Sequence, residues 1–443
     1  MKQWKTLVAL ASVVLTTQLQ AQPYELDAAA SDPRTLGWMV GFPPPPERLI
    51  GPPTSEFMSF PKLRWTFCHM REMGPTRRVS RGSGPASALT EAPEQAAIDA
   101  LRFTPIGGEG EMTWRESLDA NYTDGILIMH RGNIIYEYYS GCLDDEGRHG
   151  AMSVTKSFVG TVAEVLVADE LLDEEAPVTQ YVPELAGSAF GSATVREVMD
   201  MTTALVFSED YADPEADIWA YAAAGDPTPK PADFEGARNF YEYLQGVKPA
   251  GKHGEAFAYK SVNTDVLAWV IARASGKDFV QHLSERIWKP LGMEQEADMM
   301  VDSVGTPLAA GGLNLGLRDA ARFGQLMLQD GSYGGEQIIP KAVVDSISAG
   351  GDRARFKPAG YKTLPGGSYR SQWWVLHNAN GAYSARGIHG QAIYIDPAAQ
   401  MVIARFASFP VSANAAIDPT SLPAYQAVAD YLSAKTGQAS VQR

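Results

Sequence analysis

Two pairs of apolar segments lie far apart in the chain, and each pair has the pattern of a β-hairpin. Their strands are residues 125–130 with 134–139, and residues 392–395 with 401–406. The first pair is joined by Arg131-Gly132-Asn133, and such short connections join antiparallel neighbours. Because the hairpins stand at the two ends of a long intervening stretch, they predict an antiparallel sheet that is completed by distant parts of the chain.

The stretch between the hairpins is mostly helical in pattern. Apolar residues recur at helical spacing in residues 153–168, 264–275 and 317–328, and again in 425–432. We therefore expect a split α/β domain, with a central antiparallel sheet flanked by helices, around an all-α insertion. The domain bounds that follow are 81–165 with 305–443 for the α/β part, 166–304 for the helical part, and 22–80 for an extended Pro-rich segment.

The first residues have the composition of an export signal. Lys2 and Lys5 give a basic start, residues 7–15 form an apolar run, and Ala21 is a small residue at a cleavage position. The run is too short to span a bilayer. We expect residues 1–21 to be a signal peptide, and the mature protein to be periplasmic or secreted, without stable membrane insertion.

The formal net charge of -15 argues against nucleic acid as a partner. Cys68 and Cys142 are the two cysteines, and the sequence leaves open whether they form a disulfide or remain buried thiols. The sequence has neither His-Glu-x-x-His nor Cys-x-x-Cys, so it predicts no metal site and no cofactor. The oligomeric state is left open.

Ser153-Val154-Thr155-Lys156 stands where one of the helical patterns begins. Residues three apart lie on the same helix face, so Ser153 and Lys156 can touch. A serine hydroxyl needs a base to become a nucleophile, and a lysine serves when its pKa is lowered. Ser-x-x-Lys is typical of penicillin-recognising serine enzymes, but it also arises by chance as a helix-capping serine followed by a solvated lysine.

Two later motifs offer partners for this pair. Tyr259 could carry a proton to the leaving group if nearby cations lower its pKa, although an isolated tyrosine is more often a packing residue. Asn263 and Thr264 follow it as candidate helix caps. In Gly387-Ile388-His389-Gly390, the Ile388 N–H could form an oxyanion hole with the Ser153 N–H. His389 is either a proton-transfer group or a structural histidine.

The three motifs in this order resemble the serine β-lactamase and penicillin-binding-protein superfamily. The resemblance is strongest to the class C-related branch that contains 6-aminohexanoate-dimer hydrolases and family VIII carboxylesterases, and it covers about residue 60 to the C-terminus. It rests also on further segments: Arg64–His69, Tyr181–Leu185, Glu209–Tyr211, Asp265–Trp269 and Gln372–Trp374.

The resemblance implies a role for each matched residue. Ser153 would be the acylated nucleophile, Lys156 its base and Tyr259 the proton donor to the leaving group. Ile388 would complete the oxyanion hole, with Tyr211 and His389 contacting substrate. His389-Gly390-Gln391 stands where β-lactamases have Lys-Thr-Gly, which weakens recognition of a β-lactam carboxylate.

The sequence therefore predicts an exported serine hydrolase that cleaves carboxylic esters or small linear amides through an acyl-enzyme. One alternative is a β-lactamase or D-Ala carboxypeptidase. An alternative of another class is a penicillin-binding sensor that is acylated but does not turn over. An α/β-hydrolase is disfavoured, because Gly-x-Ser-x-Gly does not occur.

Overall fold

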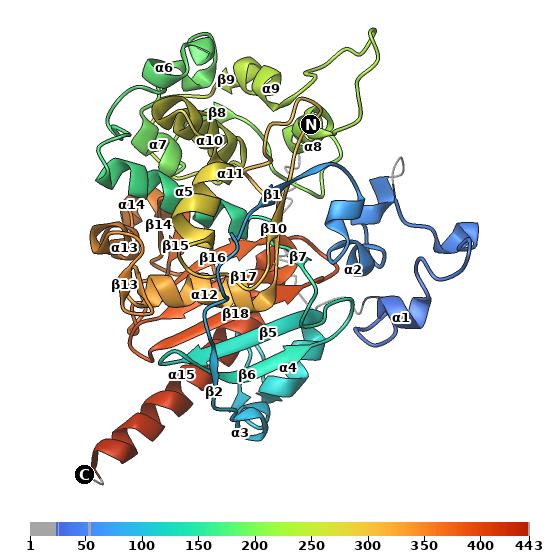
Figure 1. Ribbon diagram of the computed structural model, residues 1–443, viewed down its shortest axis with the longest axis vertical. Helices are drawn as coiled ribbons and strands as arrows, with labels where there is room; N and C mark the ends of the chain where they lie inside the picture. Colours follow the sequence, from blue (N-terminus) through green and yellow to red (C-terminus); the bar gives the residue numbers. More distant parts are fainter. Residues whose placement is uncertain (1–23, 25, 52–54, 442–443) are drawn as a thin grey trace, which may run out of the picture.

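An eight-stranded sheet forms the centre of the computed structural model, which describes Tyr24 and residues 26–51 and 55–441 (Figure 1). Its strand order is β14-β15-β16-β17-β18-β5-β6-β2, and all neighbours are antiparallel except β2 and β6. In that order the strands are Ser368–Arg370, Trp373–Val375, Tyr383–Gly387, Gln391–Asp396, Met401–Ala407, Thr123–His130, Asn133–Tyr139 and Thr90–Glu91. The two hairpins, β5–β6 and β17–β18, meet through β18 and β5, so distant parts of the chain complete one sheet.

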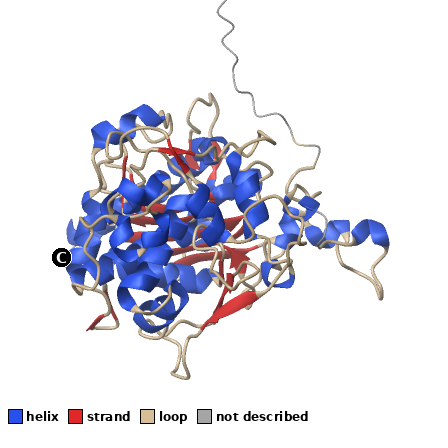
Figure 2. Ribbon diagram, turned by 90° about the horizontal axis from the view of Figure 1, so that it is seen from above, coloured by secondary structure: helices blue, strands red, loops and turns tan. Residues whose placement is uncertain are grey.

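Both faces of this sheet are buried, as the strand β5 shows. Ile126 and Ile128 pack on one face with Trp114 of α4 (Trp114–Ala120) and with α15 (Asp418–Val441). Leu127 and Met129 belong to the core on the other face, with Phe158 of α5 (Val154–Ala168) and Phe323 of α12 (Leu317–Leu328). Side chains alternate along a strand, so an unbroken apolar run such as Ile126–Met129 fits a strand that is covered on both sides. Figure 2 shows the strands lying among the helices.

The part of the chain between α5 and α12 is mainly helical. Its helices are α6 (Val178–Tyr181), α7 (Val195–Met199), α8 (Asp217–Gly225), α9 (Phe240–Gly246), α10 (Val262–Ser275) and α11 (Phe279–His282). A small sheet connects this part to the rest in the order β1-β10-β11-β7 (Thr76–Val79, Ala297–Met300, Leu313–Leu315 and His149–Gly150). α10 packs directly against both α5 and α7.

The predicted hairpins and the predicted helices are present. The fold class, an α/β sheet domain with helices, is confirmed, and the division at 166–304 stays a prediction. The segment 22–80 differs from the extended structure that we expected, because it contains the short helices α1 (Pro33–Leu36) and α2 (Leu63–Thr66). Trp65 and Met73 pack with Ile50 there, and this apolar contact favours turns over an extended strap. The predicted signal peptide lies outside the described residues.

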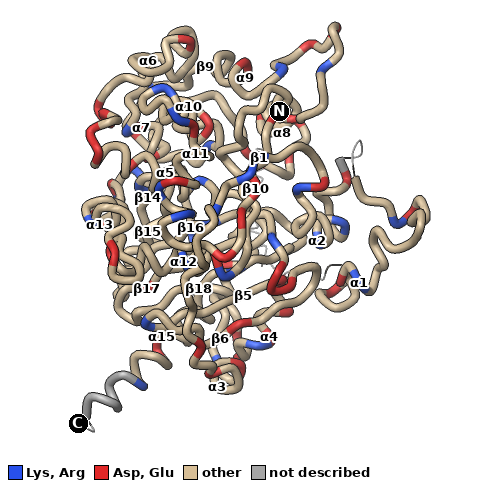
Figure 3. Tube along the Cα trace, in the orientation of Figure 1, with Lys and Arg blue, Asp and Glu red and all other residues tan. Residues whose placement is uncertain are grey.

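The N-terminal segment is attached to the sheet domain by a disulfide and a buried ion pair. Cys68 and Cys142 are bonded, with their Cα atoms 5.9 Å apart. Arg64 donates to Asp124 at 3.1 Å, and both side chains are buried. Acidic and basic side chains are interspersed along the described chain (Figure 3). No helix among the described residues is long and apolar enough to cross a bilayer.

Candidate active site

Ser153 stands at the N-cap of α5, directly after a residue with a strained backbone. Met152 has a φ of 47°, in the left-handed region that residues with a side chain rarely adopt. Such strain persists only where the surroundings enforce it, and it gathers at functional sites. Here Thr155 donates to the Met152 carbonyl at 2.7 Å, and the Leu313 N–H donates to the Thr155 hydroxyl at 3.2 Å. The turn that presents Ser153 is thereby fixed to the strand β11.

Lys156 lies one helical turn from Ser153 and is 1% exposed. Its Nζ is 2.8 Å from the Ser153 Oγ and donates to the Ala310 carbonyl oxygen at 2.6 Å. Burial lowers the pKa of Lys156 to about 8, while the carboxylates of Glu209 and Asp265 oppose that shift. An amine with this pKa is in part neutral near pH 7, so it can accept the proton of a serine hydroxyl.

Tyr259 reaches the same point from the segment that precedes α10. Its ring lies 5.1 Å from the Lys156 Nζ and stacks on Trp374, and the Ser153 side chain is near enough to act on the pKa of its hydroxyl. A lowered pKa was the condition under which cations would make Tyr259 a proton carrier. That condition is not met, because burial and then the charge of Glu209 raise the pKa of Tyr259 well above its usual value. Tyr259 is therefore a neutral phenol that can donate a proton.

The end of β16 runs beside the start of α5. A Cβ on Gly387 would lie 2.8 Å from the Ala151 carbonyl oxygen and 3.1 Å from the Ser153 nitrogen, so the two backbones approach more closely than a side chain allows. Ile388 follows Gly387 directly and packs against the cluster that contains Met152, the residue before Ser153. The geometry is compatible with an oxyanion hole of these two N–H groups, which stays a prediction.

His389 has the environment of a structural histidine, one of the two roles that the sequence left open, and its contact with substrate stays a prediction. Its ring is buried, Nδ1 lies 2.6 Å from the Phe409 carbonyl oxygen, and the ring packs edge-on against Phe67. Burial lowers the pKa of His389 to about 4, so the ring is neutral near pH 7. The backbone φ of 61° at His389 turns the chain between Ile388 and β17.

Tyr211 and Glu209 lie on the segment between β8 (Leu205–Val206) and α8. The Tyr211 hydroxyl donates to the Glu209 Oε1 at 3.1 Å, and burial raises the pKa of this tyrosine, with Glu209 and Tyr259 adding to the shift. Glu209 also accepts from the Ser261 N–H and hydroxyl, both at 2.7 Å. Tyr211 is thus in electrostatic range of Tyr259, and its contact with substrate stays a prediction.

Asn263 and Thr264, the two residues expected to cap α10, hydrogen-bond to other groups instead. The N-cap is Ser261, two residues after Tyr259. Asn263 accepts from the Thr203 hydroxyl at 2.6 Å and donates to the Lys260 carbonyl oxygen at 3.0 Å. The Thr264 hydroxyl donates to the Gln372 Oε1 at 2.8 Å. All three residues position the segment that carries Tyr259.

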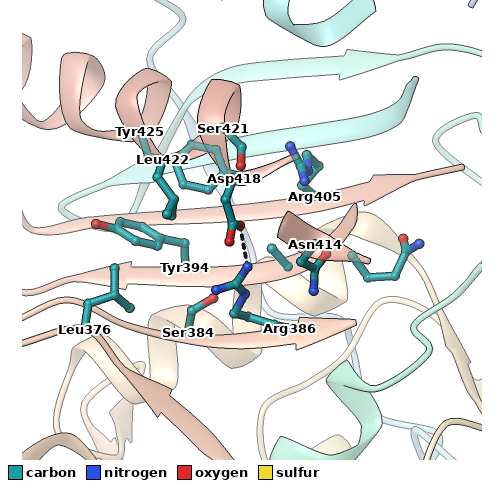
Figure 4. A pocket seen from close by; sticks show the side chains of 12 residues that line it. Leu376, Ser384, Arg386, Tyr394, Arg405, Asn414, Asp418, Ser421, Leu422 and Tyr425 are labelled. Carbon is teal, nitrogen blue, oxygen red and sulfur yellow. Dashed lines mark hydrogen bonds and ion pairs between the residues drawn. The ribbon is translucent and has the colours of Figure 1, made fainter. Parts of the chain in front are cut away.

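A small cavity lies beyond Arg386, the residue before Gly387 (Figure 4). Arg386 pairs there with Asp418 at the start of α15, and Tyr394, Leu422 and other side chains of the sheet and helix line the space. The volume of about 20 Å³ is room for about one water molecule. This cavity is therefore too small to receive a linear amide or ester.

Comparison with known proteins identifies the family. The family model described as β-lactamase matches residues 120–422, and a 6-aminohexanoate-dimer hydrolase of Paenarthrobacter ureafaciens is 36% identical over 82% of this chain and 90% of its own length. The chain belongs to the β-lactamase family. A solved structure from Bacillus anthracis, assigned as a 6-aminohexanoate-dimer hydrolase, is 31% identical to this β-lactamase-family protein, with a TM-score of 0.76 over 85% of this chain and 96% of the other. EstCE1, a hydrolase with promiscuous acyltransferase activity, shares the fold at 15% identity, with a TM-score of 0.53 over 71% of this chain and 96% of its own.

These relatives confirm that this β-lactamase-family protein is a serine hydrolase, as the sequence predicted. The structure brings Ser153, Lys156 and Tyr259 together from α5 and from the segment before α10. It also reveals buried groups to which sequence reasoning gave no role, namely Asp265 and the Ala310 carbonyl. The signal for Asp265 was its place on the buried face of α10, among Val262, Val266 and Trp269.

Proposed function

We propose that the protein is an exported hydrolase that cleaves small linear amides, and carboxylic esters as a second class, through an acyl-enzyme on Ser153. The observation that carries the proposal is the 2.8 Å contact between the Lys156 Nζ and the Ser153 Oγ, made by a lysine whose pKa burial lowers to about 8.

In the acylation step, the neutral Lys156 amine accepts the Ser153 hydroxyl proton while Oγ attacks the substrate carbonyl carbon. The Ser153 and Ile388 N–H groups stabilise the negative charge that develops on the carbonyl oxygen. Tyr259 donates its proton to the leaving amine or alcohol and regains one from the Lys156 ammonium. Attack by water on the acyl-enzyme then releases the acid and frees Ser153.

The surroundings of Tyr259 support a substrate with an apolar chain. Trp374 stacks on Tyr259, and Tyr361 and Tyr369 pack around Trp374 with ring centroids 5.0 and 5.1 Å from it. Tyr361 is 37% exposed and offers apolar contact area there, whereas Trp374 and Tyr369 are buried. The relatives named for hydrolysis of the 6-aminohexanoate dimer, which is a linear amide, support the choice of amides before esters.

An active-site fluorophosphonate probe tests the nucleophile. The probe should label the wild-type protein at Ser153, and Ser153→Ala should lose the label. Ser157→Ala is the matched control, because Ser157 lies on the same helix but donates to the Gln372 carbonyl oxygen and not to Lys156. Labelling that persists in Ser153→Ala refutes the proposal.

A substrate panel tests the reaction class. Wild type and Ser153→Ala are compared on the linear 6-aminohexanoate dimer, p-nitrophenyl butyrate and nitrocefin. We expect steady-state turnover of the amide and the ester that depends on Ser153. Turnover of nitrocefin alone would favour a β-lactamase, and a burst without turnover would favour a binding protein.

Export is part of the proposal and has two supports. The chain starts with the basic and apolar pattern of a signal peptide, and Cys68 is bonded to Cys142, as is common in oxidising compartments. Fractionation of cells that express the full chain should place the protein outside the cytoplasm. N-terminal sequencing of that protein should begin after Ala21, and an intact Met1 on cytoplasmic protein would refute export.

A further inference from the structure

A buried carboxylate lies behind the serine–lysine pair, and the proposed mechanism does not use it. Asp265, on the first turn of α10, is 3% exposed. Its Oδ1 accepts from the Ala310 N–H at 3.2 Å, and its Oδ2 accepts from the Tyr221 hydroxyl at 2.5 Å. The backbone carbonyl oxygen of the same residue, Ala310, accepts from the Lys156 Nζ at 2.6 Å. Hydrogen bonds thus lead from Tyr221 through Asp265 and Ala310 to Lys156.

We propose that Asp265 is a positioning residue for Lys156. It fixes the backbone at Ala310, which orients the amine toward Ser153, and its negative charge, which Tyr221 stabilises, keeps the buried amine basic. The inference rests on the proposed role of Lys156 as the base. Asp265 does not touch Ser153, so its action passes through Lys156.

The electrostatic part of this role follows from the position of Lys156. Burial without any counter-charge would lower the pKa of Lys156 below the value of about 8, and a weakly basic amine is a poor acceptor for a serine proton. Two carboxylates oppose that effect. Glu209 raises the pKa of Lys156 more than Asp265 does. The hydrogen bonds of Glu209 go to Ser261 and Tyr211, whereas Asp265 accepts from the backbone N–H of Ala310, the residue that binds Lys156.

Besides Glu209, the titratable groups around Ser153 and Lys156 are three tyrosines, all neutral, and the carboxyl group of Asp265. Tyr259 and Tyr211 are neutral, because burial raises their pKa values well above 10. Tyr221 is neutral for the same reason. Burial also raises the pKa of Asp265 to about 7, while the Tyr221 hydroxyl and the charge of Lys156 limit the shift. The Tyr221 hydrogen bond is therefore one of the contacts that keep Asp265 ionised near neutral pH.

The experiment measures the acidic limb of the kcat/KM profile in three variants. Asp265→Asn keeps the acceptor for the Ala310 N–H and removes the charge. The limb should move to lower pH by about 1 unit, because the lysine loses a stabilising negative neighbour. The plateau above the limb should fall several-fold, because the amine is a weaker base. A purely structural role would lower the rate without moving the limb.

Tyr221→Phe should move the limb in the same direction by a smaller amount, since the carboxylate then ionises less readily. The double variant should match Asp265→Asn alone, because Tyr221 acts through Asp265. Tyr243→Phe is the matched control: this neighbouring ring packs on Tyr221 at 5.6 Å, but its hydroxyl donates to the Asp217 carbonyl oxygen, and the limb should not move.

Circular dichroism confirms that each variant is folded, and if Asp265→Asn does not fold, Tyr221→Phe decides the question. A limb that stays in place in folded Asp265→Asn and in Tyr221→Phe overturns the inference. Fluorophosphonate labelling separates this outcome from failure of the proposed function. Wild-type protein labelled at Ser153 with an unmoved limb refutes only the role of Asp265, and protein without label at Ser153 refutes the proposed function.

Discussion

Replacement of Lys156 by methionine tests whether a neutral amine drives the reaction. Methionine has a similar length and suits a buried position, but it cannot accept a proton. With a pKa of about 8 for Lys156, about half of the wild-type enzyme has the neutral amine at pH 8, and about a hundredth at pH 6. The kcat/KM of the wild type should therefore rise about fifty-fold from pH 6 to pH 8 and level off above pH 9.

Loss of the base should lower kcat by about 100-fold or more, which corresponds to about 2.7 kcal/mol of activation free energy. The residual rate of Lys156→Met should lack the limb near pH 8. The assay is the initial rate of p-nitrophenyl butyrate hydrolysis from pH 5.5 to about 9.5, with Ser153→Ala subtracted as background. The kcat/KM profile is the one to use, because it reports groups of the free enzyme.

Lys260→Met is the matched control for this measurement. Lys260 directly follows Tyr259 and is also partly buried, but its amine donates to the Leu205 carbonyl oxygen, away from Ser153. Its burial lowers its pKa as well, so it is the other lysine near the site that could give rise to a limb. A limb near pH 8 that survives in Lys156→Met, or that disappears in Lys260→Met, would refute the reasoning.

Three further predictions concern single groups. Tyr259→Phe should lower the kcat for amides more than for p-nitrophenyl esters, because nitrophenolate leaves without a proton; equal losses on both substrates would contradict the donor role. Gly387→Val should lower kcat while circular dichroism stays unchanged, because its Cβ would press on the Ala151 carbonyl and the Ser153 nitrogen. Cys68→Ser should lower the free energy of unfolding by about 2–4 kcal/mol in a urea titration, and reduced wild type should match it, since the bond links residues 74 positions apart.

The sequence was sufficient where short-range patterns decide the structure. The hairpins β5–β6 and β17–β18 and the helices α5, α10 and α12 follow from strand and helix periodicity, and Ser153 meets Lys156 because of helical spacing. The approach of Tyr259 depends on the packing of α10 on α5, which no local pattern encodes. The sequence offered Tyr259 as one candidate partner, and the order of motifs in related proteins singled it out.

Other features could not be predicted from the sequence, because they depend on contacts or backbone angles that exist only in the folded chain. The direction of the His389 side chain depends on a φ of 61° in a turn whose conformation the sequence does not state. Asp265 in the first turn of a helix has the ordinary explanation of an acid near a helix N-terminus. Its contact with Ala310 exists only in the folded chain. The helix α2 packs through Trp65 on apolar residues of its own segment and through Leu63 on a cluster that includes Met152. Composition alone does not show these contacts and favoured an extended chain.

The turn that replaces Lys-Thr-Gly explains how the site does without a second lysine. Gln391 holds this turn with neutral hydrogen bonds, since its Nε2 donates to the Ile388 carbonyl at 3.1 Å and to the Ala407 carbonyl at 2.6 Å, and its Oε1 accepts from the Ala407 N–H at 3.0 Å. Residues 387–391 therefore bring no ammonium toward Lys156, whose pKa a second cation would lower further. Arg386, the cation nearest in sequence, is paired with Asp418. A β-lactam carboxylate that relies on a lysine at this turn therefore finds none among residues 387–391.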